Sequence, residues 1–351
     1  MALLHADALS AYGEAEDLDR LYTRAGDSAQ LTFDRTGGPG GTGALAIGGA
    51  AAFSFFRTIS AATDITMGVA FTYQGFDTDL GSGDEILLIN TTTTTQISLV
   101  LRSDGSLRLY RGASVTLLFD STNLAQTADG QAHLLSPGQE VRLELRVVLS
   151  DTVGILQLWI DDTLWCSRSN IDTSNSGTTA NRIYWKTNGS GAQYAISWWY
   201  ALDNTGSFNN SRLVGWKFTI ARPDADVASD FTPTSGTDNF AMVDEEGAHD
   251  WDNTTNSTST NGHIDRFTHS ATLPQDKVHG INVVTVPRHG GAAQNFRNKL
   301  RHSASDTNGT TTALTEAHRP LHMLVTTNPS TTAQFTKAEA EAVEFGYEQV
   351  A

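Results

Sequence analysis

Three consecutive aromatic residues, Trp198, Trp199 and Tyr200, are the side chains in this sequence best suited to contact a ligand. Aromatic rings present large apolar surfaces, and the Tyr hydroxyl adds a hydrogen-bonding group. Their surroundings read as a strand, in which neighbouring side chains face opposite sides of a sheet. Trp198 and Tyr200 therefore share one face and Trp199 takes the other. At least one large aromatic is expected to point away from the core, toward a second layer, a subunit or a ligand.

Other tryptophans raise the same question. On the strands of a β-sandwich, aromatic side chains usually belong to the core, and that is the expectation here. The alternative is a platform on which sugar rings stack. The residues concerned, besides the two already named, are Trp159, Trp165, Trp185 and Trp216.

Paired carboxylates are the second kind of chemistry to consider, because glycoside hydrolysis needs two of them across a sugar cleft. Glu140 and Glu144 alternate with Arg142 and Arg146 along one stretch. Charges of both signs on one strand face predict a solvated surface. Asp161-Asp162 is expected at a hairpin turn, where Asp is preferred for backbone reasons. We find no Gly-x-Ser-x-Gly, His-Glu-x-x-His or phosphate-binding glycine loop, so the sequence predicts a protein that is not an enzyme.

Metal and cofactor sites have weaker signals still. The densest acidic cluster, Asp244-Glu245-Glu246 with Asp250 and Asp252, could chelate calcium but lacks EF-hand spacing, so we expect a solvated loop. No histidine forms a tight ligand pair with a carboxylate, and pH sensitivity is a further possibility for them. We therefore expect no metal, no cofactor and no catalytic residue. The histidines in question are His263, His269, His279, His289, His302, His318 and His322.

The composition limits the partners. The 351 residues contain 23 Lys and Arg against 39 Asp and Glu, which gives a net charge of −16. Such an acidic chain has no electrostatic footprint for nucleic acid. No apolar stretch has the length of a transmembrane helix, and no secretory signal is visible. The single cysteine, Cys166, excludes an intramolecular disulfide. The sequence predicts neither a nucleic-acid nor a membrane partner.

The elements that would hold these side chains are strands. In residues 140–150, Val141, Leu143, Leu145 and Val147 share one face, and returns at 155–160 and 164–166 complete a three-strand meander. About a dozen strand candidates occupy residues 1–220, ending with Arg212–Ile220. Regularly spaced short strands with turns predict an all-β jelly-roll sandwich.

The composition shifts near residue 221, where we predict a domain boundary. Residues 1–220 are assigned to the sandwich, and residues 221–351 to a smaller β-rich assembly domain. One helix is expected at the C-terminus. Thr336 and Glu339 form a capping box, with Ala338, Ala342 and Phe345 expected on one helical face.

Residues 194–226 carry a resemblance to a known family. This segment resembles the one that closes a concanavalin A-like (laminin G-like) sandwich in virion proteins of tailed phages, where an aromatic strand ending in Asp leads to Leu-x-Gly and then Pro-x-Ala-Asp. The chain departs from the closing "Asp-Pro-x-Thr…Trp-Thr" element at Asn328 and Phe335, which are packing positions. Further matching stretches are Phe231-Thr232-Pro233, Asn239–Glu245 and Asn328–Gly346.

The resemblance implies a concanavalin A-like fold and a non-enzymatic structural role in a virion, as a capsid decoration protein or a tail fibre or spike subunit. It carries no catalytic residues. By analogy the partners are copies of the same chain, expected as a homotrimer, and other capsid or tail proteins. The alternative function is a receptor-binding module for host glycan. A glycan depolymerase is a more distant third.

Overall fold

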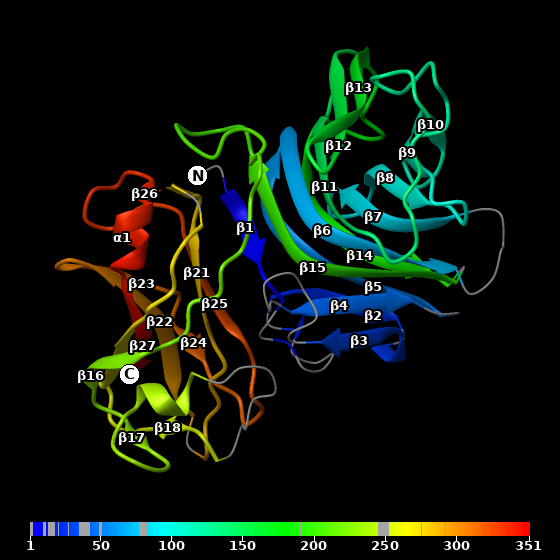
Figure 1. Ribbon diagram of the computed structural model, residues 1–351. Coiled ribbons are helices and arrows are strands. Elements are labelled where there is room, and N and C mark those ends of the chain that lie inside the picture. The colour runs from blue at the N-terminus through cyan, green and yellow to red at the C-terminus, as the bar shows by residue number, and fades with distance from the viewer. Residues whose placement is uncertain are drawn as a thin grey trace. The chain divides into compact units, whose positions relative to one another are not determined.

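The computed structural model describes residues 3–9, 12, 18–19, 21–26, 28–34, 43–48, 51–76, 83–189, 191–244, 253–274, 276–291 and 293–351 (Figure 1). The chain forms two compact units. Unit 1 contains Met1–Leu9, Tyr22–Gly38 and Gly43–Lys217. Unit 2 contains Ser10–Leu21, Pro39–Thr42 and Phe218–Ala351.

Unit 1 is built from two antiparallel sheets. Sheet A has eight strands in the order β13-β12-β11-β6-β15-β4-β3, and β1 pairs with the second half of β15. Its strands are β1 (Leu3–Asp7), β3 (Leu31–Asp34), β4 (Ala44–Gly48), β6 (Asp64–Phe76), β11 (Glu140–Val148), β12 (Gly154–Ile160), β13 (Thr163–Ile171) and β15 (Ala192–Asp203).

Sheet B has seven strands in the order β10-β9-β8-β7-β14-β5-β2. Sequential strands β7 to β10 form a meander, whereas β14 enters between β7 and β5 from far along the chain. Its strands are β2 (Thr23–Gly26), β5 (Ala52–Ala62), β7 (Asp84–Asn90), β8 (Thr95–Leu101), β9 (Leu107–Arg111), β10 (Thr116–Asp120) and β14 (Ala180–Asn188).

The core lies between these sheets and follows from alternation along each strand. Leu143 and Leu145 of β11 are 1% and 0% exposed, as the period-2 pattern predicted. The meander β11-β12-β13 is also confirmed. Trp185 of β14 and Trp199 of β15 meet edge to face, with ring centroids 6.3 Å apart. Large aromatic rings therefore join sheet B to sheet A.

One predicted strand is wrong. Residues 212–220 form no strand, because the chain turns within them: the Trp216 N–H donates to the Leu213 carbonyl, and Gly215 has a φ of +66°. Leu213 and Trp216 are buried while Val214 is 68% exposed. The apolar pattern that suggested a strand thus belongs to a turn packed on a surface. We call residues 212–216 the strap.

Unit 2 is also mainly β. Its largest sheet has the order β16-β19-β27-β22-β23, with β24 beside β22, and three two-stranded ladders accompany it: β17-β18, β20-β26 and β21-β25. The elements are β16 (Ala225–Ser229), β17 (Thr232–Pro233), β18 (Asn256–Ser257), β19 (Ile264–Thr268), β20 (Lys277–Val278), β21 (Ile281–Thr285), β22 (Asn295–His302), β23 (Ser305–Asn308), β24 (Thr312–Ala313), β25 (Leu321–Val325), β26 (Phe335–Thr336), α1 (Lys337–Glu341) and β27 (Glu344–Val350).

The C-terminal helix starts where the sequence predicted. The Thr336 hydroxyl accepts from the Glu339 N–H, and the Glu339 carboxylate accepts from the Thr336 N–H at 2.8 Å, so the capping box is confirmed. The helix is shorter than expected. It ends at Glu341, and Phe345 lies in β27, so the predicted helical face that included Phe345 is wrong. The fold as a whole confirms the all-β prediction with its one C-terminal helix.

Candidate functional site

The structure places Trp199 inside the sandwich. Its side chain is 0% exposed, and its Nε1–H donates to the Tyr22 hydroxyl at 2.9 Å. Tyr22 in turn donates to the Asp7 carboxylate at 2.6 Å. Burial, followed by the neighbouring Asp7 charge, raises the pKa of Tyr22 well above its usual value. Trp199 is therefore part of a buried polar network that holds β1 to the core.

Trp198 and Tyr200 point to the other side of sheet A, as alternation predicted. There the strap covers them. The Trp216 ring meets Trp198 edge to face at 5.7 Å and Tyr200 at 5.0 Å between centroids. Tyr200 fits because its strand partner is Gly68, where a Cβ would lie 2.2 Å from the Tyr200 ring. The second layer that the sequence left open is the strap.

All three predicted ligand aromatics are thus interior residues. Trp198, Trp199 and Tyr200 are 6%, 0% and 1% exposed. They are therefore not surface or ligand aromatics: of the alternatives that the sequence left open, the structure shows a second layer, because the strap covers Trp198 and Tyr200 on the outer face of sheet A. Nothing in their own strand foretells this covering.

A closed ion cluster lies beside Tyr200. The Tyr200 hydroxyl donates to Glu144 Oε1 at 2.5 Å, and Arg212 of the strap donates to Glu144 Oε2 at 2.5 Å and to Asp162 Oδ1 at 2.6 Å. The Arg212 guanidinium also lies 5.0 Å from the centroid of the Trp159 ring. We call these five residues the clasp.

The clasp corrects the solvated face predicted for β11 at Glu144, whereas Glu140 is exposed and Arg142 and Arg146 are partly exposed. Glu144 is only 1% exposed because the strap covers it. Burial raises the pKa of Glu144, against the opposing effects of the Tyr200 hydroxyl and Arg212. Asp161 and Asp162 do lie at the β12-β13 turn, with φ of +48° and +65°, as predicted. Because Glu144 and Asp162 share one guanidinium, the pair holds a cation of the chain rather than flanking an open cleft.

A different aromatic group lies on the outer face of sheet B. Phe56 of β5 and Tyr184 of β14 are strand partners whose rings stack with centroids 4.5 Å apart and planes at 29°. The Arg182 guanidinium lies 4.7 Å from the centre of the Phe56 ring and donates to the Tyr184 hydroxyl at 3.4 Å. All three side chains are half-buried. Together they place a stacked aromatic pair on this face, with a cation over the Phe56 ring.

Polar groups continue this surface along β14. Lys186, two residues beyond Tyr184, forms an ion pair with Glu85 of β7 at 2.8 Å. Ser114 donates to the other Glu85 oxygen at 2.9 Å. Burial would raise the pKa of Glu85, but Lys186, Ser114 and Asn188 together hold it below its usual value. We call Phe56, Tyr184, Arg182, Lys186 and Glu85 the aromatic face.

The aromatic face is one end of a row that crosses all seven strands of sheet B. Register places these residues side by side, from one edge to the other: Leu117, Tyr110, Ser98, Leu88, Tyr184, Phe56 and Thr23. The middle of the row is covered, since Ser98 is 0% exposed and donates to the Gly112 carbonyl. The half-buried aromatic residues of the row are therefore Tyr110 on one side of Ser98 and the Tyr184 and Phe56 pair on the other.

Sequence reasoning missed the aromatic face, although one signal was present. In residues 182–187, Arg182, Tyr184 and Lys186 alternate with buried Ile183, Trp185 and Thr187. That alternation places a Tyr between two cations on the outer side. What the sequence does not contain is the pairing with Phe56, which lies more than a hundred residues earlier.

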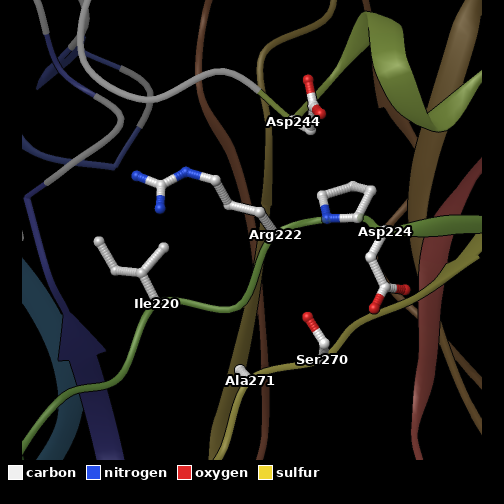
Figure 2. Close-up of a pocket in the computed structure, with 7 residues that line it drawn as sticks. Ile220, Arg222, Asp224, Asp244, Ser270 and Ala271 are labelled. Atoms are coloured by element: carbon white, nitrogen blue, oxygen red, sulfur yellow. The ribbon is translucent and has the colours of Figure 1, made fainter.

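A shallow depression of about 320 Å³ lies in unit 2 (Figure 2). Its lining contains both basic and acidic side chains. The Asp224 carboxylate already accepts a hydrogen bond from the Thr268 hydroxyl at 2.7 Å. In Figure 2 the side chain of Arg222 extends to the left and that of Asp224 extends downward, so they do not converge on one point. This depression lacks the convergent groups of a binding site. The lining residues are Ile220, Arg222, Pro223, Asp224, Asp244, Ser270 and Ala271.

The remaining candidates come from the acidic cluster and the histidines. Of the cluster, Asp244 is described, whereas residues 245–252 lie outside the described residues. Within the described part of the chain, no three His, Cys, Asp or Glu side chains come together to hold a metal ion. The same part contains no helix long and apolar enough to span a membrane. Cys166 is a buried free thiol whose pKa burial raises to about 12.

The residues that carried the family resemblance in unit 2 have packing roles. Asn239 donates through Nδ2 to the Phe231 carbonyl and to Asp265, both at 2.9 Å. Tyr347 also donates to Asp265, at 3.0 Å, so the buried carboxylate is fully engaged. Phe335 is 2% exposed and belongs to a core cluster. These motif positions stabilise the unit rather than form a site.

Comparison with known proteins finds distant structural likenesses. No protein-family model and no curated protein matches the chain. The metal-free carbohydrate recognition domain of Emp46p matches 57% of this chain and 94% of its own length, at 11% identity and a TM-score of 0.39. A Bacillus subtilis protein of unknown function with a galectin-like fold matches the same share, at 12% identity and a TM-score of 0.40, over 96% of its length.

A sialidase also matches 57% of the chain, at 14% identity and a TM-score of 0.40, but the match spans only 18% of the sialidase. At these identities the likeness concerns the fold alone. The two antiparallel sheets of unit 1 confirm the predicted all-β sandwich, and its concanavalin A-like character stays a prediction. The tailed-phage part of the resemblance stays a prediction.

Proposed function

We propose that the protein binds glycan without catalysing a reaction, and that the aromatic face of sheet B is the binding surface. The observation that carries the proposal is the stacked, half-buried Phe56 and Tyr184 pair flanked by Arg182. Flat aromatic rings accept the apolar face of a sugar ring, while nearby charged groups can bond its hydroxyls. Lys186 and Glu85 supply such groups on the same surface.

The alternative surface in unit 1 is less suitable. Trp198 and Tyr200 lie under Trp216, and the Glu144 carboxylate already accepts from Tyr200 and Arg212. A sugar there would have to displace the strap. The shared guanidinium of the clasp also leaves no room for the two separated carboxylates of a hydrolase, which supports the non-enzymatic proposal.

A glycan array tests the proposal directly. We expect the purified chain to bind a subset of glycans and Tyr184→Ala to lower their affinity by about tenfold or more, since stacking on the aromatic pair is lost. The matched control is Trp159→Ala, which removes a half-buried aromatic from the outer face of sheet A. Equal losses in the two variants, or an array without any bound glycan, would contradict the assignment.

A second candidate is assembly into a virion, with the chain acting as a capsid decoration protein or a tail fibre or spike subunit. The sequence resemblance supports it, as do exposed apolar residues at the β10 edge of sheet B. Val115 and Leu117 are 74% and 43% exposed there. Its partners would be copies of the chain, as a homotrimer, and other capsid or tail proteins.

Quantitative mass spectrometry of purified virions tests that setting. Hundreds of copies in fixed ratio to the capsid subunit would support decoration, and a few to some dozens would support a tail appendage. Both are compatible with glycan binding by sheet B. Absence from the particle would remove the virion proposal and leave the glycan proposal to the array.

A further inference from the structure

Arg182 differs from Lys186, the other cation of the aromatic face, in having no acidic partner among the described residues. Its Nη1 donates to the Thr92 carbonyl at 2.7 Å and to the Tyr184 hydroxyl. No carboxylate among the described residues forms an ion pair with it. By contrast, Lys186 is paired with Glu85, and Arg108 on the same side of sheet B is paired with Asp120 at 2.7 Å.

The missing partner is informative because acids are abundant in this chain. There are 39 Asp and Glu for 23 Lys and Arg, and the clasp gives two carboxylates to the single cation Arg212. Arg182 has used two of its five N–H groups on neutral oxygens, both through one nitrogen. Its Nε is buried without a hydrogen-bond partner, so Nη2 is the nitrogen that remains to form a charge-assisted hydrogen bond with a carboxylate.

Position adds a second constraint. The guanidinium lies against the Phe56 ring and next to the Tyr184 hydroxyl. A ligand whose ring stacks on this pair therefore places its substituents beside Arg182. Charges more than about 8 Å away are largely screened at physiological ionic strength, so the net charge of the chain matters less here than these neighbours.

We propose that the aromatic face selects acidic glycans, with Arg182 pairing to the carboxylate of a uronic or sialic acid whose ring lies on Phe56 and Tyr184. This inference rests on the proposed glycan-binding function and specifies the ligand class. Arg182 acts as the specificity-determining residue, and Tyr184 and Phe56 provide the surface that a neutral sugar would also use.

Titration calorimetry with matched sugar pairs tests the inference. One pair is sialyllactose and lactose, and the other is a hexameric galacturonate and its carboxyl-reduced form. We expect the native chain to bind the acidic member at least about tenfold more tightly, as a charge-assisted bond requires. Arg182→Gln should abolish that preference while keeping the affinity for the neutral member.

The control is Arg168→Gln in β13. Arg168 also donates to a backbone carbonyl, that of Leu118 at 2.9 Å, and also forms no ion pair among the described residues, but it lies in sheet A. The same change of charge there should keep the acidic preference. Arg182→Lys, which retains the charge, should restore part of it, and circular dichroism verifies that each variant is folded.

The outcomes separate the two proposals. Equal affinity for the acidic and neutral members, or loss of the preference in Arg168→Gln as well, would overturn the acidic-glycan inference and leave glycan binding intact. Binding to neither member of either pair, together with a blank glycan array, would overturn both.

Discussion

Unit 1 contains two clusters in which an arginine lies on an aromatic ring, one on the outer face of each sheet. In the clasp, Arg212 lies 5.0 Å from the centre of Trp159 and binds two carboxylates. On the aromatic face, Arg182 lies 4.7 Å from the centre of Phe56 and binds none of the described carboxylates. The residue types are alike, and the surroundings differ.

The difference teaches how to separate a structural cluster from a binding surface. The charged groups of the clasp pair with one another, and Glu144 lies under the strap. Their interactions therefore contribute to folding. The aromatic face keeps one cation and two rings partly exposed, which is why we propose it as the ligand-binding surface. Residue composition alone does not distinguish the two clusters. They differ in whether the arginine has an acidic partner among the described residues.

Removing the Trp216 ring of the strap should have the largest effect on stability. Trp216→Ala deletes a ring that is 4% exposed and contacts both Trp198 and Tyr200, and we expect it to lower the free energy of unfolding by about 4 kcal/mol. Urea titration followed by Trp fluorescence measures this, because all tryptophans but Trp251 fall in unit 1. Val214→Ala, on the exposed side of the strap, should cost less than about 0.5 kcal/mol. Similar losses in both variants would show that the strap packs differently.

Removing the cation of the clasp should rank second. Arg212→Met leaves Glu144 buried without its charge partner, and breaking such a pair costs about 3 kcal/mol. The same urea titration provides the value. A change below about 1 kcal/mol would mean that water reaches Glu144, and the clasp would then resemble the aromatic face more closely than we argue.

The ion pair on the aromatic face should have an intermediate, pH-dependent effect. Lys186, Ser114 and Asn188 outweigh burial and lower the pKa of Glu85, so its ionised form favours the folded state. We expect Glu85→Gln to cost about 2 kcal/mol at neutral pH, as loss of a charged hydrogen-bonding group does. That cost should be complete above the ordinary Glu pKa and should shrink as the pH falls through the lowered folded-state value.

Urea titrations of the native chain and Glu85→Gln between pH 3 and 7 measure this difference. The exposed Glu316 provides the control, since Glu316→Gln should leave stability unchanged within about 0.5 kcal/mol at every pH. A difference that grew toward low pH would reverse the sign and contradict the assignment.

The smallest effect completes the comparison. Arg182→Met should change the free energy of unfolding by less than about 0.5 kcal/mol, because no described carboxylate loses a partner and the methionine can still cover Phe56. The measurement is the urea titration used for Arg212→Met. A loss as large as that of Arg212→Met would make Arg182 a structural residue and remove the contrast between the clusters.

Much of the fold was predictable because it depends on local pattern. Alternation located the core face of β11, placed Trp199 opposite Trp198 and Tyr200, and set the Asp161-Asp162 turn. The site was not predictable, because it depends on which distant segments meet. Glu144 looks like a solvated residue until the strap is placed over it, and Tyr184 looks ordinary until register pairs it with Phe56.

The position of the strap along the chain has a mechanical consequence. It ends at Trp216, one residue before the last residue of unit 1, Lys217, after which unit 2 begins at Phe218. Tension along this connection therefore reaches the strap before any strand of sheet A. The hydrogen bonds from Arg212 to Glu144 and Asp162 therefore anchor this connection to sheet A.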